Sequence, residues 1–144
     1  MIETTVSQPS TPLLVIRPDA DILTRDRTPN FVGISAKTTG AKGLSMNLVI
    51  MPPGAVATPH IHPVHETAIY ILKGRVEFRY GQQLEHCQIC EAGDFIFTPS
   101  GMPHQPRNLS ATESVHALAS RNDPDEQEQS IPYHLTPEVK HEDQ

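Results

Sequence analysis

The sequence predicts an all-β domain, and three observations lead to this prediction. Its apolar residues fall in short runs of four to eight residues, which is the usual length of a β-strand. Turn-forming residues separate nearly all of these runs. The 14 prolines, and the absence of any convincing long amphipathic stretch, argue against helices. About eight short strands with frequent turns are typical of a β-sandwich or jelly-roll barrel, in which one sheet packs against another.

The expected strands follow one another closely along the chain. They cover the apolar runs at residues 13–16, 31–36, 44–51, 67–73, 75–80, 87–90, 94–98 and 114–120. Lys73, Gly74 and Arg75 are predicted to form a tight hairpin between two of these strands. Phe95 and Phe97 alternate with other side chains, and this period of two predicts an aromatic face in the core.

A chain of 144 residues is long enough for one domain whose core needs no disulfide or metal to stabilise it. We expect a barrel domain at residues 13–120. A polar arm at residues 1–12 precedes it, and a polar, acidic tail at residues 121–144 follows it.

The charge and hydropathy of the chain restrict its partners. A net charge of −6, a pI near 5.7 and the lack of any Lys/Arg run argue against nucleic acid and anionic membranes. No apolar stretch approaches the roughly 20 residues that span a bilayer, and the N-terminus has no signal-peptide pattern. We therefore expect a cytoplasmic protein that binds a small molecule.

Cys87 and Cys90 have a C-x-x-C spacing, which also occurs in redox and zinc sites. Their surroundings are predicted to form a strand, on which residues three apart point to opposite faces. The two thiols are therefore not expected to share one site. No second C-x-x-C pair accompanies them, so structural roles are favoured, with a redox or zinc role as the alternative.

The residues that could carry chemistry gather in two stretches of the chain. His60 and His62 flank one residue, and the period of two along a strand places both imidazoles on the same face. Glu66 follows four residues later, and His104 follows a Gly/Pro-rich turn in the second stretch. Imidazole nitrogens and a carboxylate oxygen suit a divalent first-row transition metal. We predict that the two stretches meet around one ion.

Two motifs in these stretches resemble those of the cupin superfamily. The first, G-x5-H-x-H-x3or4-E-x6-G, is matched by Gly54, His60, His62, Glu66 and Gly74. The second, G-x5-P-x-G-x2-H-x3-N, is matched by Gly93, Pro99, Gly101, His104 and Asn108. The resemblance covers about residues 44–119 and implies a small single-domain cupin with a double-stranded β-helix (jelly-roll) barrel. It also implies a homodimer, and a metal ion held by His60, His62, Glu66 and His104.

The first motif departs from the family pattern at one point. Seven residues lie between Glu66 and Gly74, where the pattern has six, and a slip of one residue reverses the face that a side chain takes. If a bulge absorbs the extra residue, Glu66 points inward as the fourth ligand, which we favour because its spacing from the histidine pair fits. If the strand is regular, the inward face carries His65, Thr67 and Ile69, and His65 is the alternative fourth ligand.

A metal ion with these ligands keeps coordination positions open for a bidentate substrate or dioxygen. We expect a metal-dependent enzyme of the oxygenase, isomerase or decarboxylase type that acts on a small chelating organic molecule. Glu66 and Tyr70 are its candidate catalytic residues because both can move a proton, and core packing is the other role open to Tyr70. Iron, manganese, nickel and zinc all fit this donor set. The alternative function is a non-catalytic cupin that binds a small ligand or a metal.

Overall fold

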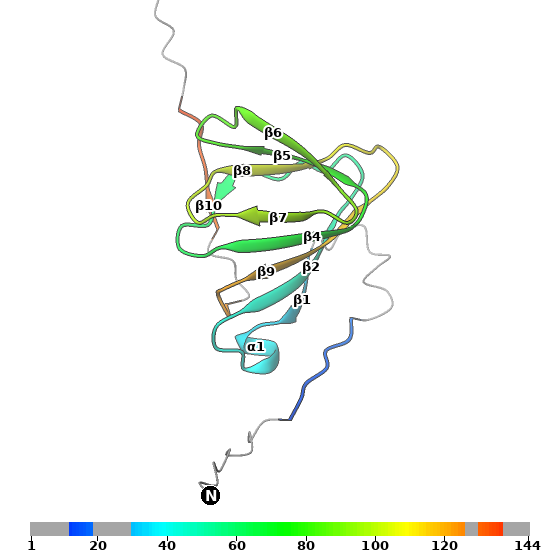
Figure 1. The fold of residues 1–144 in the computed structure, drawn as a ribbon, viewed down its shortest axis with the longest axis vertical. Coiled ribbons are helices and arrows are strands. Elements are labelled where there is room, and N and C mark those ends of the chain that lie inside the picture. Colours follow the sequence, from blue (N-terminus) through cyan, green and yellow to red (C-terminus); the bar gives the residue numbers. More distant parts are fainter. Residues whose placement is uncertain (1–11, 19–29, 126–129, 137–144) are drawn as a thin grey trace, which may run out of the picture.

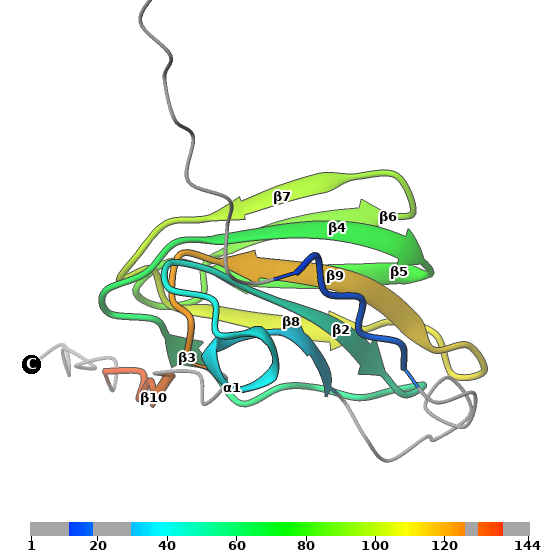
Figure 2. The same cartoon turned by 90° about the horizontal axis from the view of Figure 1, so that it is seen from below.

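The computed structural model describes residues 12–18, 30–125 and 130–136, and their strands form two antiparallel sheets of five strands each (Figure 1). The first sheet has the order β1 (Asn30–Ile34), β2 (Ser45–Met51), β9 (Val115–Arg121), β4 (Thr67–Lys73) and β7 (Phe95–Thr98). The second has the order β10 (Ile131–Pro132), β3 (His60–Ile61), β8 (His104–Asn108), β5 (Arg75–Tyr80) and β6 (His86–Glu91). The two sheets fold over each other as layers of one barrel (Figure 2), which confirms the all-β jelly-roll architecture.

Seven of the eight expected strands are present, and the expected strand at residues 13–16 is wrong. Residues 12–18 contain no strand, and Leu13 is 89% exposed. An apolar run forms a stable strand only where it finds a sheet edge and a surface that buries its side chains. Within the described residues, this run pairs with no strand.

The short elements escape prediction from apolar runs. Strands β3 and β8 begin with histidine and are interrupted or flanked by proline, so neither has the composition of a strand. The helix α1 (Ala36–Thr39) is one turn long, and a capping box forms its start: Ser35 Oγ accepts from the Thr38 N–H, and Thr38 Oγ1 accepts from the Ser35 N–H. No helix in the described part of the chain is long and apolar enough to cross a membrane.

Part of the expected acidic tail joins the second sheet. Pro132 of β10 pairs with His60 of β3, and the Tyr133 N–H donates to the Pro59 carbonyl over 2.9 Å. Figure 2 shows β10 beside β3 at one end of the barrel. Nearly all of the N-terminal arm and much of the tail lie outside the described residues, so the character predicted for them stays a prediction.

The predicted hairpin at Gly74 is wrong, because the two strands it joins lie in different sheets. β4 pairs with β7 and β9, whereas β5 pairs with β6 and β8. Gly74 has φ +90°, and a Cβ there would lie 3.0 Å from Cγ2 of Val115 and 3.1 Å from the Ser114 carbonyl oxygen. The glycine therefore forms a tight corner at which the chain crosses between sheets, packed against the start of β9.

The core lies between the two sheets and contains Ile71, Val76, Cys90, Val115 and Ala117. Cys90 is buried and Cys87 is exposed, so the two thiols lie on opposite faces of β6 as predicted. Burial raises the pKa of the Cys90 thiol, and nearby Asp94 raises it further, which keeps this thiol protonated.

The prediction of an aromatic core along β7 is wrong. Phe95 is 86% exposed and Phe97 is 60% exposed, whereas Ile96 between them packs against the core and Thr98 is buried. The alternation along the strand is therefore present with the opposite face inward. A period of two identifies two faces, but only the packing of the other sheet decides which one is buried.

Asn108, the last residue of the second motif, ties three segments of the chain together. Its side-chain amide donates to the carbonyl oxygens of Met51, Pro52 and Glu113 over 3.1, 3.0 and 2.8 Å, and its Oδ1 accepts from the Ser110 N–H over 2.9 Å. The side chain is only 2% exposed. Asn108 thus joins the ends of β2 and β8 to the loop that leads into β9.

We predict that Asn108→Ala lowers the free energy of unfolding by about 3 kcal/mol, because it leaves buried carbonyls and an N–H without partners. Gln105→Ala on the same strand is the matched control, since among the described residues the Gln105 amide donates to the Ala57 carbonyl alone, and should cost about 1 kcal/mol. Urea unfolding measures both. Equal losses for the two variants would contradict this role of Asn108.

Candidate metal centre

Three imidazoles converge at one end of the barrel. His60 begins β3, His62 directly follows β3, and His104 begins β8 as the cross-strand partner of His60. Each of the three can offer a ring nitrogen, and these nitrogens all lie within 4.8 Å of one another. The ring centroids of His60 and His104 are 4.2 Å apart. The stretch that contains His60 and His62 therefore meets the stretch that contains His104, and the three histidines could hold a metal ion.

Backbone carbonyls orient two of these rings. Nδ1 of His60 lies 2.8 Å from the Thr58 carbonyl oxygen, and Nδ1 of His104 lies 3.0 Å from the Met102 carbonyl oxygen. A protonated Nδ1 that donates to a carbonyl leaves the lone pair of Nε2 available for a metal ion. Nδ1 of His62 is buried without a hydrogen-bond partner among the described residues. The donor set and this unsatisfied nitrogen both fit a bound transition metal.

Burial and neighbouring charges keep two of the three imidazoles, those of His62 and His104, neutral. Burial lowers the pKa of His62 to about 3, and the neighbouring His104, His60 and Arg121 contribute to the decrease. Burial lowers the pKa of His104 to about 4, although its hydrogen bond to the Met102 carbonyl acts in the opposite direction. Metal ions bind the neutral form of histidine, so both rings are ready for coordination at neutral pH.

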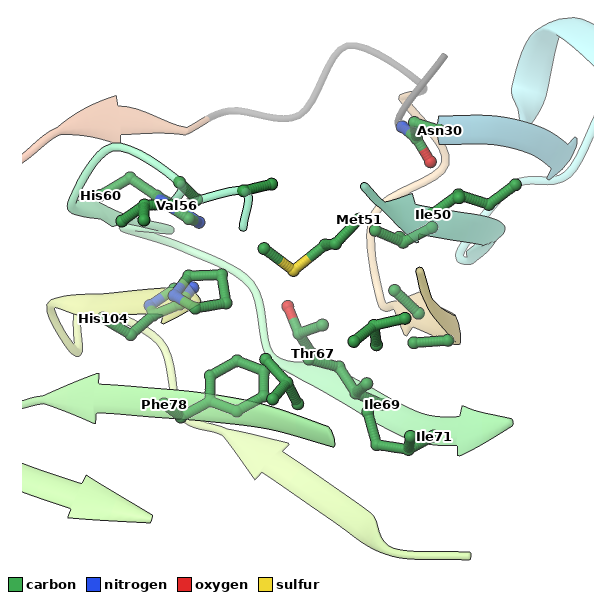
Figure 3. Close-up of a pocket in the computed structure, with 18 of the residues that line it drawn as sticks. Asn30, Ile50, Met51, Val56, His60, Thr67, Ile69, Ile71, Phe78 and His104 are labelled. Carbon is green, nitrogen blue, oxygen red and sulfur yellow. The ribbon is translucent and has the colours of Figure 1, made fainter. Parts of the chain in front are cut away.

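The histidines line a cavity of about 570 Å³ that runs between the two sheets. Figure 3 shows His60 and His104 on one side of it, with Met51, Thr67, Phe78 and Ile69 around its interior. Most of the other lining side chains are apolar and come from strands of both sheets. The wall is therefore mostly apolar, and Asn30 adds a polar side chain on the side away from His60 and His104 (Figure 3).

The inward face of β4 carries Thr67, Ile69 and Ile71, all of which line the cavity. Thr67 is 3% exposed, and its Oγ1 is buried without a hydrogen-bond partner among the described residues. Four residues lie between His62 and Thr67, and six lie between Thr67 and Gly74. Both spacings of the first motif are thus satisfied when threonine stands where that motif has glutamate.

Glu66, expected as the fourth ligand, lies outside the histidine cluster. Its side chain is exposed, and its backbone N–H donates to Oδ1 of Asn122 over 2.9 Å. A register irregularity is present on β4, but it lies between Ile71 and Lys73, near the far end of the strand. This irregularity is several residues away from Glu66, so it does not turn the Glu66 side chain toward the cavity.

His65, the alternative ligand, is buried but also lies outside the cluster. Its ring centroid is 4.8 Å from that of His62, and its Nδ1 lies 3.6 Å from a carboxylate oxygen of Asp123. Asp123 follows β9, so His65 lies between the histidine cluster and the segment after that strand. This position suits a residue that packs against the His62 ring and holds its orientation.

Tyr70, expected as a catalytic residue, does not line the cavity with the histidines. It lies on the outer side of the first sheet, where its ring centroid is 4.7 Å from that of Phe95. Arg121 is the cavity residue that the sequence interpretation missed. The alternation Val115, Ala117, Ala119, Arg121 along β9 carries the signal, because the first three side chains are buried and the fourth shares their face.

We predict that the metal-free protein loses stability as the pH falls from about 6.5 towards 4. His62 and His104 have folded pKa values below the unfolded value of 6.5, so the unfolded state binds more protons than the folded state in this pH window. The loss should approach about 1.4 kcal/mol per pH unit for each histidine. Urea unfolding in the presence of a chelator measures it.

His104→Gln should reduce this slope, because it removes one of the two linked groups. His86→Gln is the control, since the His86 side chain is 60% exposed on β6, and it should leave the slope unchanged. If stability does not change between pH 6.5 and 4, the pKa values of His62 and His104 are not lowered by folding, and the prediction is wrong.

Comparisons with known proteins agree with this geometry. A family model for the cupin domain matches residues 47–120. Germin-like protein 3-1 of Oryza sativa subsp. japonica is 27% identical over 95 residues, which cover 65% of this chain and 42% of that protein. Oxalate oxidase in complex with glycolate matches with a TM-score of 0.61 and 23% identity, over 74% of this chain and 57% of that chain. The polyketide cyclase RemF from Streptomyces resistomycificus matches with a TM-score of 0.62 and 21% identity, over 75% of this chain and 72% of that chain.

The chain thus spans less than half of the germin-like protein and little more than half of the oxalate oxidase chain. The structural matches, at 21% and 23% identity, show a shared jelly-roll fold. An oxidase and a cyclase share this fold, so the fold alone does not select a reaction.

Proposed function

This chain belongs to the cupin family, and from that premise we propose that it is a metal-dependent enzyme acting on a small chelating organic molecule. The observation that carries the proposal is the convergence of His60, His62 and His104 at one end of an apolar cavity. The glycolate complex of the structurally similar oxalate oxidase supports a small oxygen-bearing ligand for a site of this kind.

The three imidazoles would hold one divalent ion of iron, manganese, nickel or zinc. When bound, such an ion supplies Lewis-acid or redox chemistry to a ligand with oxygen donors. The carbonyls of Thr58 and Met102 would orient two of the ligands, and the apolar wall would contact the carbon atoms of a bound molecule. The proposal covers reactions of the oxygenase, isomerase and decarboxylase types.

Thr67 is the residue of this chain best placed to contact a bound molecule beside the histidines. Its buried hydroxyl faces the cavity, and it can donate to or accept from an oxygen atom of the ligand. Glu66 and Tyr70 do not line the cavity, so neither side chain is placed to exchange a proton with a ligand bound there. His65, held near Asp123, would act through His62 by keeping that ring in place.

One observation favours the alternative, a cupin that binds a small ligand or metal without transforming it. Neither candidate for a general acid or base, Glu66 or Tyr70, faces the cavity. In that case the cavity would bind its ligand through the ion and the apolar wall alone. Turnover distinguishes this alternative from the enzyme.

The test begins with full-length protein purified without a chelator or a nickel column. Elemental analysis should find about one transition-metal ion per chain, and His104→Ala should weaken metal binding about tenfold or more. Glu66→Gln is the matched control and should bind metal as the unmodified protein does, because its side chain is exposed outside the cluster.

The protein is then loaded with iron(II), manganese(II), nickel(II) or zinc(II) and screened with small chelating acids and phenols. Turnover with at least one metal is expected. Thermal stabilisation by a ligand without any product would favour the binding protein. No bound metal, together with no effect of a chelator on stability, would contradict both functions.

We also propose that the protein is a homodimer, as the family resemblance implies. Exposed apolar side chains support this assembly: Phe95 and Phe97 on β7, and Leu13 in the segment before the barrel. A second copy that covers them would remove apolar surface from water. Light scattering coupled to size-exclusion chromatography should give the mass of two chains, and the mass of one chain would contradict the proposal.

A further inference from the structure

The cavity has a second polar position at Asn30, the first residue of β1. Asn30 lies opposite Val49 in the β1–β2 pair, and Val49 lies opposite Ala117 in the β2–β9 pair. Directly opposed residues of an antiparallel pair point to the same face of the sheet, and Ala117 belongs to the core. The Asn30 side chain therefore points inward, where it lines the cavity.

The carboxamide oxygen of Asn30 is buried and has no hydrogen-bond partner among the described residues. Buried acceptors are usually paired, either with protein groups or with ordered water. A ligand that displaces water from such an oxygen loses affinity unless it supplies its own O–H or N–H donor. Asn30 therefore favours a ligand that carries a hydrogen-bond donor at this side of the cavity.

Asn30 and the histidine cluster lie on opposite sides of the cavity. Figure 3 shows Asn30 across from His60 and His104, with the Met51 side chain between them. β1 is an edge strand of the first sheet, whereas His60 and His104 begin strands of the second. A single molecule that contacts both Asn30 and a metal ion at the histidines must therefore be elongated.

The wall between these two positions is mostly apolar, and it includes Ile69, Ile71 and Val76. Its volume of about 570 Å³ lies in the range of roughly 300–1,000 Å³ that encloses drug-sized ligands. Thr67 adds one hydroxyl to this wall: it is 3% exposed, and its Oγ1 is buried without a hydrogen-bond partner among the described residues. The cavity thus offers polar contacts at two separated places and apolar contacts between them.

We propose that the cavity binds an elongated molecule with a chelating oxygen group at one end, an apolar middle and a hydrogen-bond donor at the other end. The chelating group lies at the histidines within reach of the Thr67 hydroxyl, and the donor pairs with the carboxamide oxygen of Asn30. Asn30 is the specificity-determining residue of this site. The inference rests on the proposed metal site and narrows its substrate class.

Calorimetric titration of the zinc-loaded, full-length protein tests this proposal with two series of acids, from pentanoate to decanoate. One series consists of α-hydroxy acids, which end in a methyl group, and the other of the matching α,ω-dihydroxy acids. At one chain length the ω-hydroxyl should tighten binding about tenfold, as expected when a buried acceptor gains its partner. The ω-methoxy acid of that length keeps the oxygen but lacks the donor, and it should bind no better than the α-hydroxy acid.

Asn30→Leu should weaken binding of the best dihydroxy acid about tenfold and leave the matching α-hydroxy acid within about twofold. Gln88→Leu is the control, because it removes an exposed carboxamide on β6, outside the cavity, and should change neither affinity. Thr67→Val should weaken both acids by a similar factor, about fivefold, and leave their ratio unchanged.

The outcomes separate this inference from the proposed function. A protein that binds zinc and α-hydroxy acids but gains no affinity from an ω-hydroxyl at any chain length overturns the donor end and leaves the metal site intact. An unchanged preference for the dihydroxy acid in folded Asn30→Leu overturns the role of Asn30. If Asn30→Leu fails to fold, the ω-hydroxy and ω-methoxy acids on the unmodified protein decide whether a donor is selected. A protein that binds no zinc overturns the metal site itself, and with it the inference.

Discussion

The pairing of β4 with β9 is the constraint that decides which side chains face the three histidines across the cavity. Thr67 lies opposite Arg121 in this register, and the inward side chains of both strands alternate from that pair along the cavity. A shift of one residue on β4 would bring Glu66 inward and bury its carboxylate beside the imidazoles. The observed register instead places Thr67 and Arg121 on the wall that faces the three histidines.

The three histidines do not depend on that register, because they come from the other sheet. His60 and His104 are cross-strand partners in β3 and β8, and carbonyls of their own flanking loops orient them. The sheet that carries the three histidines and the sheet that carries Thr67 and Arg121 line the cavity from opposite sides.

Sequence reasoning succeeds here where a property depends on neighbouring residues. The period of two predicts correctly that Cys87 and Cys90 lie on opposite faces of a strand. The two motifs predict correctly that His104 lies beside His60 and His62. It fails where tertiary packing decides between two local possibilities. The face of β7 that carries Phe95 is outside, and the turn at Gly74 crosses between sheets, because the partner of each strand is chosen by the whole barrel.

Glu66 illustrates the same limit at the site. The motif allows three or four residues after the second histidine, so Glu66 and Thr67 both satisfy that half of the pattern, and only Thr67 also satisfies the distance to Gly74. A carboxylate is a typical metal ligand, so the sequence favours Glu66 over Thr67 as a ligand, although Thr67 has the position that fits both spacings. The distance to Gly74 favours the position of Thr67, but only the strand register shows that Thr67 is the residue that faces inward.

X-ray absorption spectroscopy at the edge of the bound metal, on protein purified without a chelator or a nickel column, tests the three-histidine centre most directly. Scattering from three imidazoles is expected, together with light-atom ligands from solvent, and the spectrum of Glu66→Gln should be the same as that of the unmodified protein. Loss of a ligand in Glu66→Gln, or a fourth imidazole that disappears in His65→Gln, would contradict a centre built from His60, His62 and His104 alone.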